Sequence, residues 1–331
     1  SNGSISSGGS FDNSGNSGIL FTPSSSRVLY WVGGNGLWSD STHWSLSSGG
    51  VSGACVPSPI DSIVFDSSST NGSNSLNVSL VSPAYGKDIV ITPFGPSLYI
   101  SYSNEYLNVY GSLYFNEKAN INCNVSLLSD HGNELLQTDY SYFRSINLDA
   151  DSSYYTVSDS LRVNSFRQYQ GNIDFNGNYS WIYSYEGNAD TLTNLNGEMY
   201  FGYATVSNNW NIPDSKITVA YRIFFYGNIQ ANNSFIDMTG TNARLIFNSN
   251  DTLASVVFSN VNGNSKYSSS TTGFITHMEF MGNGEFQTDT YCDTLVFSNG
   301  QSYFIEANKE VHIDSFFDCD GDFCNPILIR S

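Results

Sequence analysis

Charged residues, and basic residues above all, are scarce in this sequence. Asp, Glu, Lys and Arg make up 13% of the 331 residues, against roughly 25% in typical soluble domains. The chain has 12 Lys and Arg against 30 Asp and Glu, which gives a formal net charge of -18. Binding to nucleic-acid phosphates or to anionic lipid requires clustered basic side chains, and the sequence has no such cluster. We therefore expect no nucleic-acid partner and no docking on an anionic membrane.

Long apolar runs are also absent. No stretch approaches the 18 or so apolar residues that a membrane-spanning helix needs, so we expect no direct membrane insertion.

Cysteines are too few for a disulfide scaffold, since the chain has only 5. Cys319 and Cys324 are close enough in sequence to bridge a tight turn, provided that the protein reaches an oxidising compartment. Cys55, Cys123 and Cys292 are isolated, and we expect them to be small buried apolar side chains.

Helical periodicity is missing as well, apart from one candidate turn at residues 134–137. Apolar residues two positions apart recur instead, as in Leu107–Val109, Leu245–Phe247 and Leu295–Phe297, and this pattern is typical of short strands. Gly-Asn pairs such as Gly171-Asn172 separate these strands, and both residue types tolerate the positive φ of a corner.

Two all-β architectures fit this pattern. A β-sandwich or barrel has strands of about 5–6 residues joined by hairpins. A β-helix has shorter strands, three per coil of roughly 20–25 residues. We predict an all-β fold of the second kind, a right-handed parallel β-helix (solenoid) with an N-terminal Trp/Gly-rich cap.

The domain organisation follows from this prediction. We expect a flexible Ser/Gly/Asn-rich lead-in over residues 1–26, a capping segment over residues 27–66, and a β-helix over residues 67–331 that continues beyond the chain end. An uncovered first coil would expose both the core and strand edges. The residues predicted to form the structural cap are Trp31, Trp38, His43 and Trp44.

Both ends of the chain resemble a known family. The N-terminal residues that carry the resemblance are Trp31-Val32-Gly33-Gly34, Gly36, Trp38-Ser39-Asp40, His43-Trp44-Ser45, Gly49-Gly50, Asp61 and Ile63-Val64-Phe65. The C-terminal residues are Gly282-Asn283-Gly284, Phe286, Leu295, Phe297-Ser298, Gly300, Tyr303, Ile313, Asp318-Cys319, Gly321, Phe323-Cys324-Asn325-Pro326-Ile327 and Ile329.

These segments are similar to the opening and the β-helical coils of very large repetitive surface adhesins of gliding Bacteroidetes, which are substrates of the type IX secretion system. The resemblance implies a non-catalytic part of a cell-surface or secreted adhesin that attaches to surfaces, glycans or cells, with gliding motility as one setting. It also implies an extracellular or outer-cell-surface location. The implied partners are the type IX secretion and outer-membrane surface machinery, and glycans or abiotic surfaces.

A second pattern, Asp-Ser/Thr followed by an aliphatic residue, resembles the O-glycosylation acceptor of Bacteroidetes. Its candidate acceptors are Ser62, Ser160, Thr191, Thr252 and Thr294.

Metal-ligand candidates are few. Asp318, Asp320 and Asp322 surround Gly321 and could offer oxygen ligands to a structural Ca²⁺, although the loop lacks the bidentate Glu of an EF-hand. A solvated acidic turn is the simpler interpretation. The four histidines lack metal-ligand spacing, and His43 is expected to pack against the neighbouring indoles. We expect no other cofactor.

Catalysis is the main alternative, because β-helices also host polysaccharide hydrolases and lyases, which need clustered carboxylates. The best candidates are Asp149 with Asp151 and the segment 130–132, and each is more simply a turn. We therefore predict a non-enzyme. A polysaccharide-active β-helix enzyme and a β-sandwich carbohydrate-binding module are the alternatives.

Aromatic residues leave one question open. Trp181, Tyr183 and Tyr185 alternate, so we expect them on one face of a sheet, with Trp181 in an aromatic core ladder. Tyr140 and Tyr142 could either stack on sugars or be structural.

Overall fold

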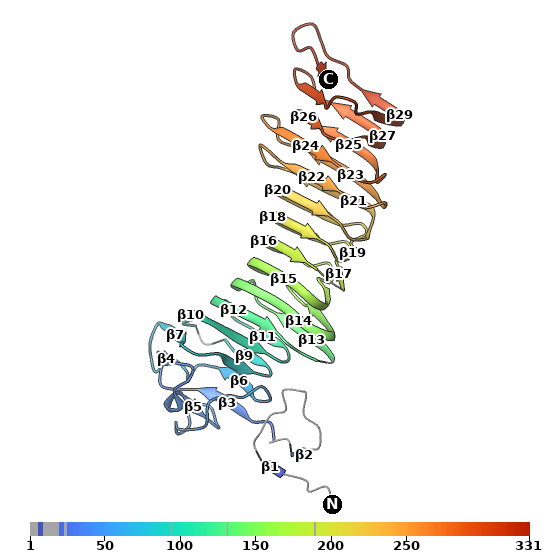
Figure 1. The fold of residues 1–331 in the computed structure, drawn as a ribbon. Helices are drawn as coiled ribbons and strands as arrows, with labels where there is room; N and C mark the ends of the chain where they lie inside the picture. Colours follow the sequence, from blue (N-terminus) through green and yellow to red (C-terminus); the bar gives the residue numbers. More distant parts are fainter. Residues whose placement is uncertain (1–5, 9–19, 23–24, 94, 131, 189) are drawn as a thin grey trace, which may run out of the picture. The chain divides into compact units, whose positions relative to one another are not determined.

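The computed structural model is nearly all β, with 58% of residues in strands, and forms a β-solenoid of about 12 turns (Figure 1). It describes residues 6–8, 20–22, 25–93, 95–130, 132–188 and 190–331. These residues contain no α-helix, only one 3-10 turn, η1 (Ser41–His43). The predicted parallel β-helix is confirmed, and the β-sandwich alternative is wrong because the strands of successive coils pair in parallel. The right-handed winding stays a prediction.

The chain divides into two compact units, Ser1–Val125 and Ser126–Ser331. The boundary between the units, at Val125 and Ser126, differs from the predicted end of the capping segment at residue 66, and that segment stays a prediction. Most of the predicted lead-in, residues 1–26, lies outside the described residues.

The first unit begins with short strands and continues as parallel coils. β3 pairs antiparallel with β5 and in parallel with β6, and β7 and β8 each pair in parallel with β10. Its strands are β1 (Ser6–Gly8), β2 (Leu20–Thr22), β3 (Val28–Trp31), β4 (Gly36–Leu37), β5 (Trp44–Ser45), β6 (Ser62–Phe65), β7 (Ser75–Leu80), β8 (Ala84–Gly86), β9 (Ile89–Ile91), β10 (Ser97–Val109) and β11 (Leu113–Phe115); β12 (Ala119–Leu127) crosses the unit boundary.

The second unit consists of stacked parallel coils. Its strands are β13 (Gly132–Gln137), β14 (Tyr142–Val157), β15 (Leu161–Asp174), β16 (Ser180–Gly187), β17 (Thr191–Thr193), β18 (Glu198–Val206), β19 (Asn209–Asn211), β20 (Lys216–Phe225), β21 (Ile229–Met238), β22 (Arg244–Phe247), β23 (Thr252–Phe258), β24 (Asn264–Ser268), β25 (Phe274–Phe280), β26 (Asn283–Phe286), β27 (Thr290–Phe297), β28 (Ser302–Ile305), β29 (Val311–Asp318) and β30 (Leu328–Arg330).

Strand pairing in the second unit arranges the chain in three columns. The first column contains the buried residues Phe143, Val163, Ile182, Phe201, Val219 and Met238 in successive coils, and later Phe258, Phe280 and Phe297. The second contains Ile146, Phe166, Tyr185, Ala204, Ile223, Leu245, Tyr267 and Phe286. The third contains Tyr155, Ile173, Leu192, Trp210 and Ile229, and later Ala231, Leu253, Ile275 and Cys292.

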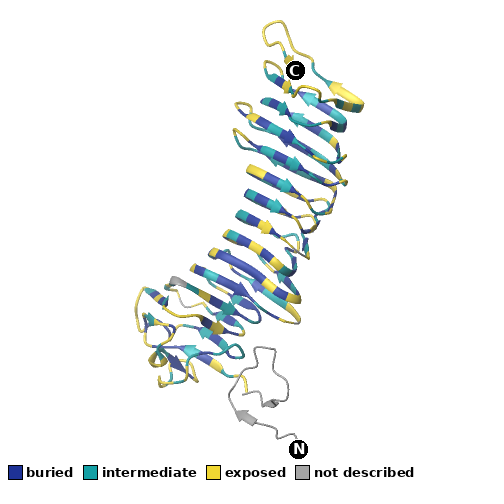
Figure 2. Cartoon of the chain, viewed as in Figure 1, coloured by how far each residue is buried: buried dark blue, intermediate teal, exposed yellow. Residues whose placement is uncertain are grey.

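These three columns form a continuous apolar core. Burial of each large apolar side chain stabilises the fold by about 1.5–3 kcal/mol. Between the buried positions, exposed and half-buried residues alternate along the strands (Figure 2). Coil length varies: Phe274 pairs with Tyr291, 17 residues on (291 − 274), and Leu245 pairs with Tyr267, 22 residues on (267 − 245).

Two local predictions are wrong. The candidate helical turn at residues 134–137 is part of strand β13. Cys55 is exposed rather than buried, while Cys123 and Cys292 are buried as expected.

The four residues predicted to form the cap pack together in the first unit. The His43 ring stacks on Trp31 at 4.7 Å between centroids and 6° between planes, and Trp44 meets Trp31 edge-on at 5.0 Å. Trp38 meets Trp44 at 5.0 Å and lies 6.2 Å from Phe65 of β6. All three indoles are buried, and Trp31 and Trp44 donate their ring N–H groups to backbone carbonyls at 2.7 and 2.8 Å.

Glycine makes this packing possible. A Cβ at Gly36 would lie 1.9 Å from His43 Nε2, so a side chain at that position would displace the ring. The tryptophans of the segment thus form one aromatic cluster together with His43, and Gly36 leaves room for the His43 ring.

Candidate functional site: an exterior ladder of aromatic side chains

Outward-facing side chains of the second unit form a ladder across neighbouring coils. In the first column, Tyr142 pairs with Arg162, Arg162 with Trp181, and Trp181 with Tyr200. Each of these residues directly precedes a buried residue of the first column, so strand alternation turns its side chain outward. The result is a line of large side chains on the surface of four coils.

The prediction for Trp181, Tyr183 and Tyr185 is wrong in two ways. Trp181 and Tyr183 are half-buried on the exterior, and Tyr185 alone is in the core. The alternation breaks at Tyr183 and Ser184, which are both half-buried, because the chain passes there from the first column to the second. A period-two pattern read across a corner therefore assigns Tyr185 to the wrong face.

The exterior rings pack against one another. Trp181 and Tyr200 are parallel within 3° at 5.8 Å, and Tyr203 and Tyr221 stack at 4.9 Å. Tyr183 meets Tyr203 edge-on at 5.7 Å. Its ring lies over Gly202, where a Cβ would come within 2.8 Å of the ring carbons.

Arginines lie against both ends of this group of rings. The Arg162 guanidinium carbon is 5.5 Å from the centroid of Tyr142 and 5.8 Å from that of Trp181. Arg222 lies 5.6 Å from Tyr203 and 4.7 Å from Phe224. These distances suit cation–π attraction. We call this set the exterior ladder: Tyr142, Arg162, Trp181, Tyr183, Tyr200, Tyr203, Tyr221, Arg222 and Phe224.

The phenols of the ladder are suited to hydrogen bonding rather than to proton transfer. Desolvation raises the pKa of Tyr183 above its ordinary value, and the neighbouring phenols Tyr203 and Tyr221 raise it further. Desolvation also raises the pKa of Tyr200. Both groups therefore stay neutral at physiological pH. Edges of stacked rings with hydroxyl groups form an amphipathic surface.

A second polar cluster lies inside the coils. The Tyr185 hydroxyl donates to Gln168 Oε1 at 2.8 Å, and Asn208 Nδ2 donates to the same oxygen at 3.1 Å. Gln168 Nε2 donates to the carbonyl of Gly171 at 2.7 Å. Because these side chains are fully buried, the cluster is part of the core and has no access for a ligand.

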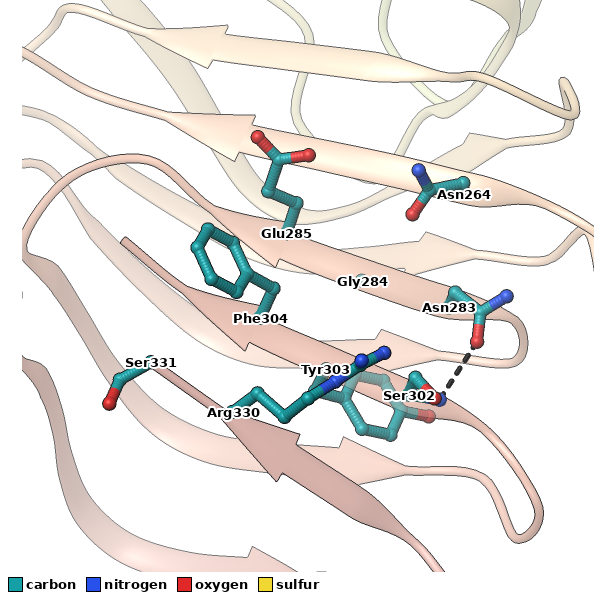
Figure 3. A pocket seen from close by; sticks show the side chains of 9 residues that line it. All are labelled: Asn264, Asn283, Gly284, Glu285, Ser302, Tyr303, Phe304, Arg330 and Ser331. Carbon is teal, nitrogen blue, oxygen red and sulfur yellow. Dashed lines mark hydrogen bonds between the residues drawn. The ribbon is translucent and has the colours of Figure 1, made fainter. Parts of the chain in front are cut away.

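A surface hollow of about 680 Å³ lies over the last coils (Figure 3). Its lining includes Glu285, Phe304 and Arg330, which pair in successive coils. Glu285, the one carboxylate among the lining side chains, is already paired with Lys266 at 2.7 Å. Among the described residues, the lining therefore offers one carboxylate side chain, whereas glycoside hydrolysis commonly uses two.

Of the predicted calcium ligands, Asp318 is the half-buried last residue of β29, and Asp320 and Asp322 follow it and are exposed. No group of three or more His, Cys, Asp or Glu able to hold a metal exists among the residues that the structure describes. Asp322 accepts hydrogen bonds from the backbone of Cys324 at 2.8 Å and Asn325 at 2.7 Å, so it stabilises its own turn. Calcium binding by Asp318, Asp320 and Asp322 stays a prediction.

The predicted disulfide is not formed in this structure, where Cys319 and Cys324 are both free thiols. A bridge in an oxidising compartment stays a prediction. Catalysis by the predicted candidates also stays a prediction. Asp149 and Asp151 are exposed on β14 beside Ser152, whose φ of 61° marks a turn, and His131 lies outside the described residues.

The aspartates of the Asp-Ser/Thr-aliphatic pattern have a structural role that the sequence interpretation missed. Four of them accept a hydrogen bond from a backbone N–H of the preceding coil or segment. The pairs are Asp61 with Arg27, Asp159 with Thr138, Asp190 with Gly171, and Asp251 with Ile229. The sequence does carry a signal of this structural role, because the pattern recurs just before strands.

The five predicted glycosylation acceptors differ in exposure. Thr252 is exposed, whereas Ser62, Ser160, Thr191 and Thr294 are half-buried. Ser62, Ser160 and Thr191 lie at or next to strand starts, and Thr294 lies in the middle of β27. Modification of these residues stays a prediction.

The fold and the exterior ladder define the chain as a parallel β-solenoid repeat protein. No protein-family model, no curated protein and no solved structure matches it. Among the described residues, no helix has the length and apolar character required to cross a membrane.

Proposed function

We propose that this chain is a non-catalytic binding element of a large cell-surface or secreted adhesin, and that it attaches to glycans through the exterior ladder. The observation that carries the proposal is the ladder itself: large side chains, mostly aromatic, on the outside of successive coils, where core packing does not require them. Tyr and Trp offer a sugar both apolar surface and a polar edge.

Two further features support this function. The surface is poor in charge, so its polar groups are mainly hydroxyls and amides, which hydrogen-bond to sugars. The resemblance of both chain ends to gliding Bacteroidetes adhesins suggests export by type IX secretion and an outer-surface location. A role in attachment during gliding fits that setting.

The test is a glycan array with the purified chain, followed by a reducing-sugar assay on every glycan that binds. We expect binding without release of reducing ends. Trp181→Ala/Tyr200→Ala should weaken binding about tenfold, which corresponds to about 1.4 kcal/mol. The matched control is Tyr169→Ala, since Tyr169 is an exposed tyrosine of β15 outside the ladder.

Three outcomes would count against the proposal. Absence of glycan binding, or equal loss of binding in the control, would exclude the ladder as a glycan site. Release of reducing ends would favour the alternative, a polysaccharide-active β-helix enzyme.

A further inference from the structure

Three basic residues lie in register on the exterior of the second column. Arg222 of β20 pairs with Arg244 of β22, which pairs with Lys266 of β24. These strands are adjacent in the stack (Figure 1). The residues are separated by 22 positions each (244 − 222 and 266 − 244), one coil apart. We call them the cationic stripe. The interpretation that the sequence contains no basic cluster is therefore wrong for these three.

The stripe is unusual for this chain. Like charges directly opposite one another on neighbouring strands destabilise a sheet. The protein has only 12 basic residues against 30 acidic ones, so chance would seldom bring three basic residues into line. An anionic ligand would remove the repulsion between them.

The positive charge of the stripe is only partly neutralised by the protein. Lys266 pairs with Glu285 at 2.7 Å. Neither Arg222 nor Arg244 forms an ion pair with any described residue: Arg222 lies against rings, and Arg244 donates to the neutral Gln287 at 3.1 Å. Arg244 Nε is buried, and the positive charge of Arg244 helps to lower the pKa of the Glu285 carboxyl. Arg222 is exposed and is therefore available to an acidic partner, whereas Glu285 offsets part of the charge of both Lys266 and Arg244.

The stripe continues the exterior ladder. Tyr203 of the ladder pairs with Arg222, so one exterior column runs from Tyr203 through Arg222 and Arg244 to Lys266. Neighbouring strands are about 4.8 Å apart, so the three cations span roughly 10 Å along the stack. At the far end Glu285 follows Lys266 in register. Its negative charge ends the cationic surface.

We propose that the ladder and the stripe together bind a linear anionic polysaccharide, one with carboxylate or sulfate groups, running along the stack of coils. Arg222, Arg244 and Lys266 bind its acidic groups, and the aromatic side chains contact the adjacent sugar rings. This inference rests on the proposed glycan-binding function and adds the class of glycan.

The overall charge favours such a glycan over nucleic acid. A net charge of -18 repels a polyanion at long range, and duplex DNA carries one charge per about 1.7 Å of its axis. A polysaccharide with sparser charge can meet a short stripe of cations at a lower electrostatic cost.

The test measures affinity for four probes: heparin as a sulfated chain, polygalacturonate as a carboxylate chain, dextran as a neutral chain, and a double-stranded DNA oligonucleotide. The stripe variant is Arg222→Gln/Arg244→Gln/Lys266→Gln. The control variant, Arg144→Gln/Arg167→Gln/Lys216→Gln, removes the same charge from elsewhere on the same unit. Circular dichroism and thermal melting check the fold of each variant.

We expect an acidic polysaccharide to bind more tightly than dextran, and its binding to weaken at least about tenfold in the stripe variant. The control variant should change affinity by less than about twofold. If the triple variant fails to fold, Arg222→Gln/Lys266→Gln should still weaken binding. Arg222→Lys/Arg244→Lys should retain most of it, because the charge is kept.

The outcomes separate this inference from the proposed function. Binding of neutral glycans alone, unaffected by the stripe variant, would overturn the inference and leave the proposed function standing. Failure of every glycan, both on the array and among the probes, would overturn both. Tighter binding of DNA than of the acidic polysaccharides would overturn the assignment of the ligand class, and equal weakening in the control variant would show a non-specific charge effect.

Discussion

At the scale of single residues, Asp61 is the clearest case of a charge that the fold requires. Its carboxylate is 1% exposed, and it accepts hydrogen bonds from Arg27 Nη2 at 2.6 Å and from Ser58 Oγ at 2.7 Å. Burial alone raises the pKa of Asp61, but the hydrogen bonds from Arg27 and Ser58 outweigh it, so the pKa falls below the ordinary value of 3.8.

A carboxyl with a lowered pKa stabilises the folded state fully above its unfolded pKa, and this contribution is lost as pH falls through the folded pKa. We predict that Asp61→Asn reduces the free energy of unfolding by about 2 kcal/mol at pH 7, since Arg27 keeps partial contact with water. Urea unfolding followed by tryptophan fluorescence measures it. The difference between the variant and the wild type should shrink as pH falls below the ordinary pKa of 3.8 and through the lowered pKa of the folded state. A difference that stays constant from pH 7 to pH 2 would refute the ionic role of Asp61.

At the scale of elements, the corner aspartates explain how short strands keep their register between coils. Asp251 precedes β23 and accepts hydrogen bonds from the Ile229 backbone N–H and from Ser249 Oγ, both at 2.6 Å. One carboxylate thus holds a corner of its own coil to the start of β21 in the coil before it. Asp159 and Asp190 likewise accept hydrogen bonds from backbone N–H groups of the preceding coil, from Thr138 just after β13 and from Gly171 within β15.

This device predicts different effects for two adjacent residues of one motif. Asp251→Ala should lower the free energy of unfolding by about 1–3 kcal/mol, because it leaves the Ile229 N–H without its acceptor. Thr252→Ala, at the exposed neighbouring position, should change it by less than about 0.5 kcal/mol. Chemical denaturation of unglycosylated protein measures both values. Equal effects of the two changes would argue against a structural role for the motif.

How far the sequence predicts the elements depends on whether a residue lies within a strand or at a corner. Within strands, alternation identifies the core face, as at Leu245 and Phe247, because the side-chain period is two. At corners the period is interrupted, so alternation predicts the same face for Tyr185 and Trp181, although Tyr185 is in the core and Trp181 is on the exterior. The helical turn expected at residues 134–137 failed because strand pairing with β14 overrides a short local preference.

At the scale of the molecule, the candidate site could not be predicted from the sequence, because its residues come together only when successive coils stack. Arg222, Arg244 and Lys266 are isolated along the chain, and their 22-residue spacing has meaning only once the coil length is known. The aromatic richness of the middle region was visible in the sequence. Its division between core and exterior was not, because both faces of these strands carry aromatic residues.

The acidic excess of the whole chain gives a last prediction. With 30 acidic and 12 basic residues, the negative charges within the folded protein repel one another at neutral pH and destabilise the fold. Raising NaCl from about 10 mM to about 150 mM shortens the Debye length from about 30 Å to about 8 Å. The melting temperature at pH 7 should therefore rise by about 2–4 °C. The control is the same salt series near the sequence pI of about 4.2, where the net charge is close to zero and the rise should vanish. Differential scanning calorimetry measures both series. An equal rise at both pH values would attribute the stabilisation to general salt effects, and a fall at pH 7 would mean that local ion pairs outweigh the repulsion between the acidic residues.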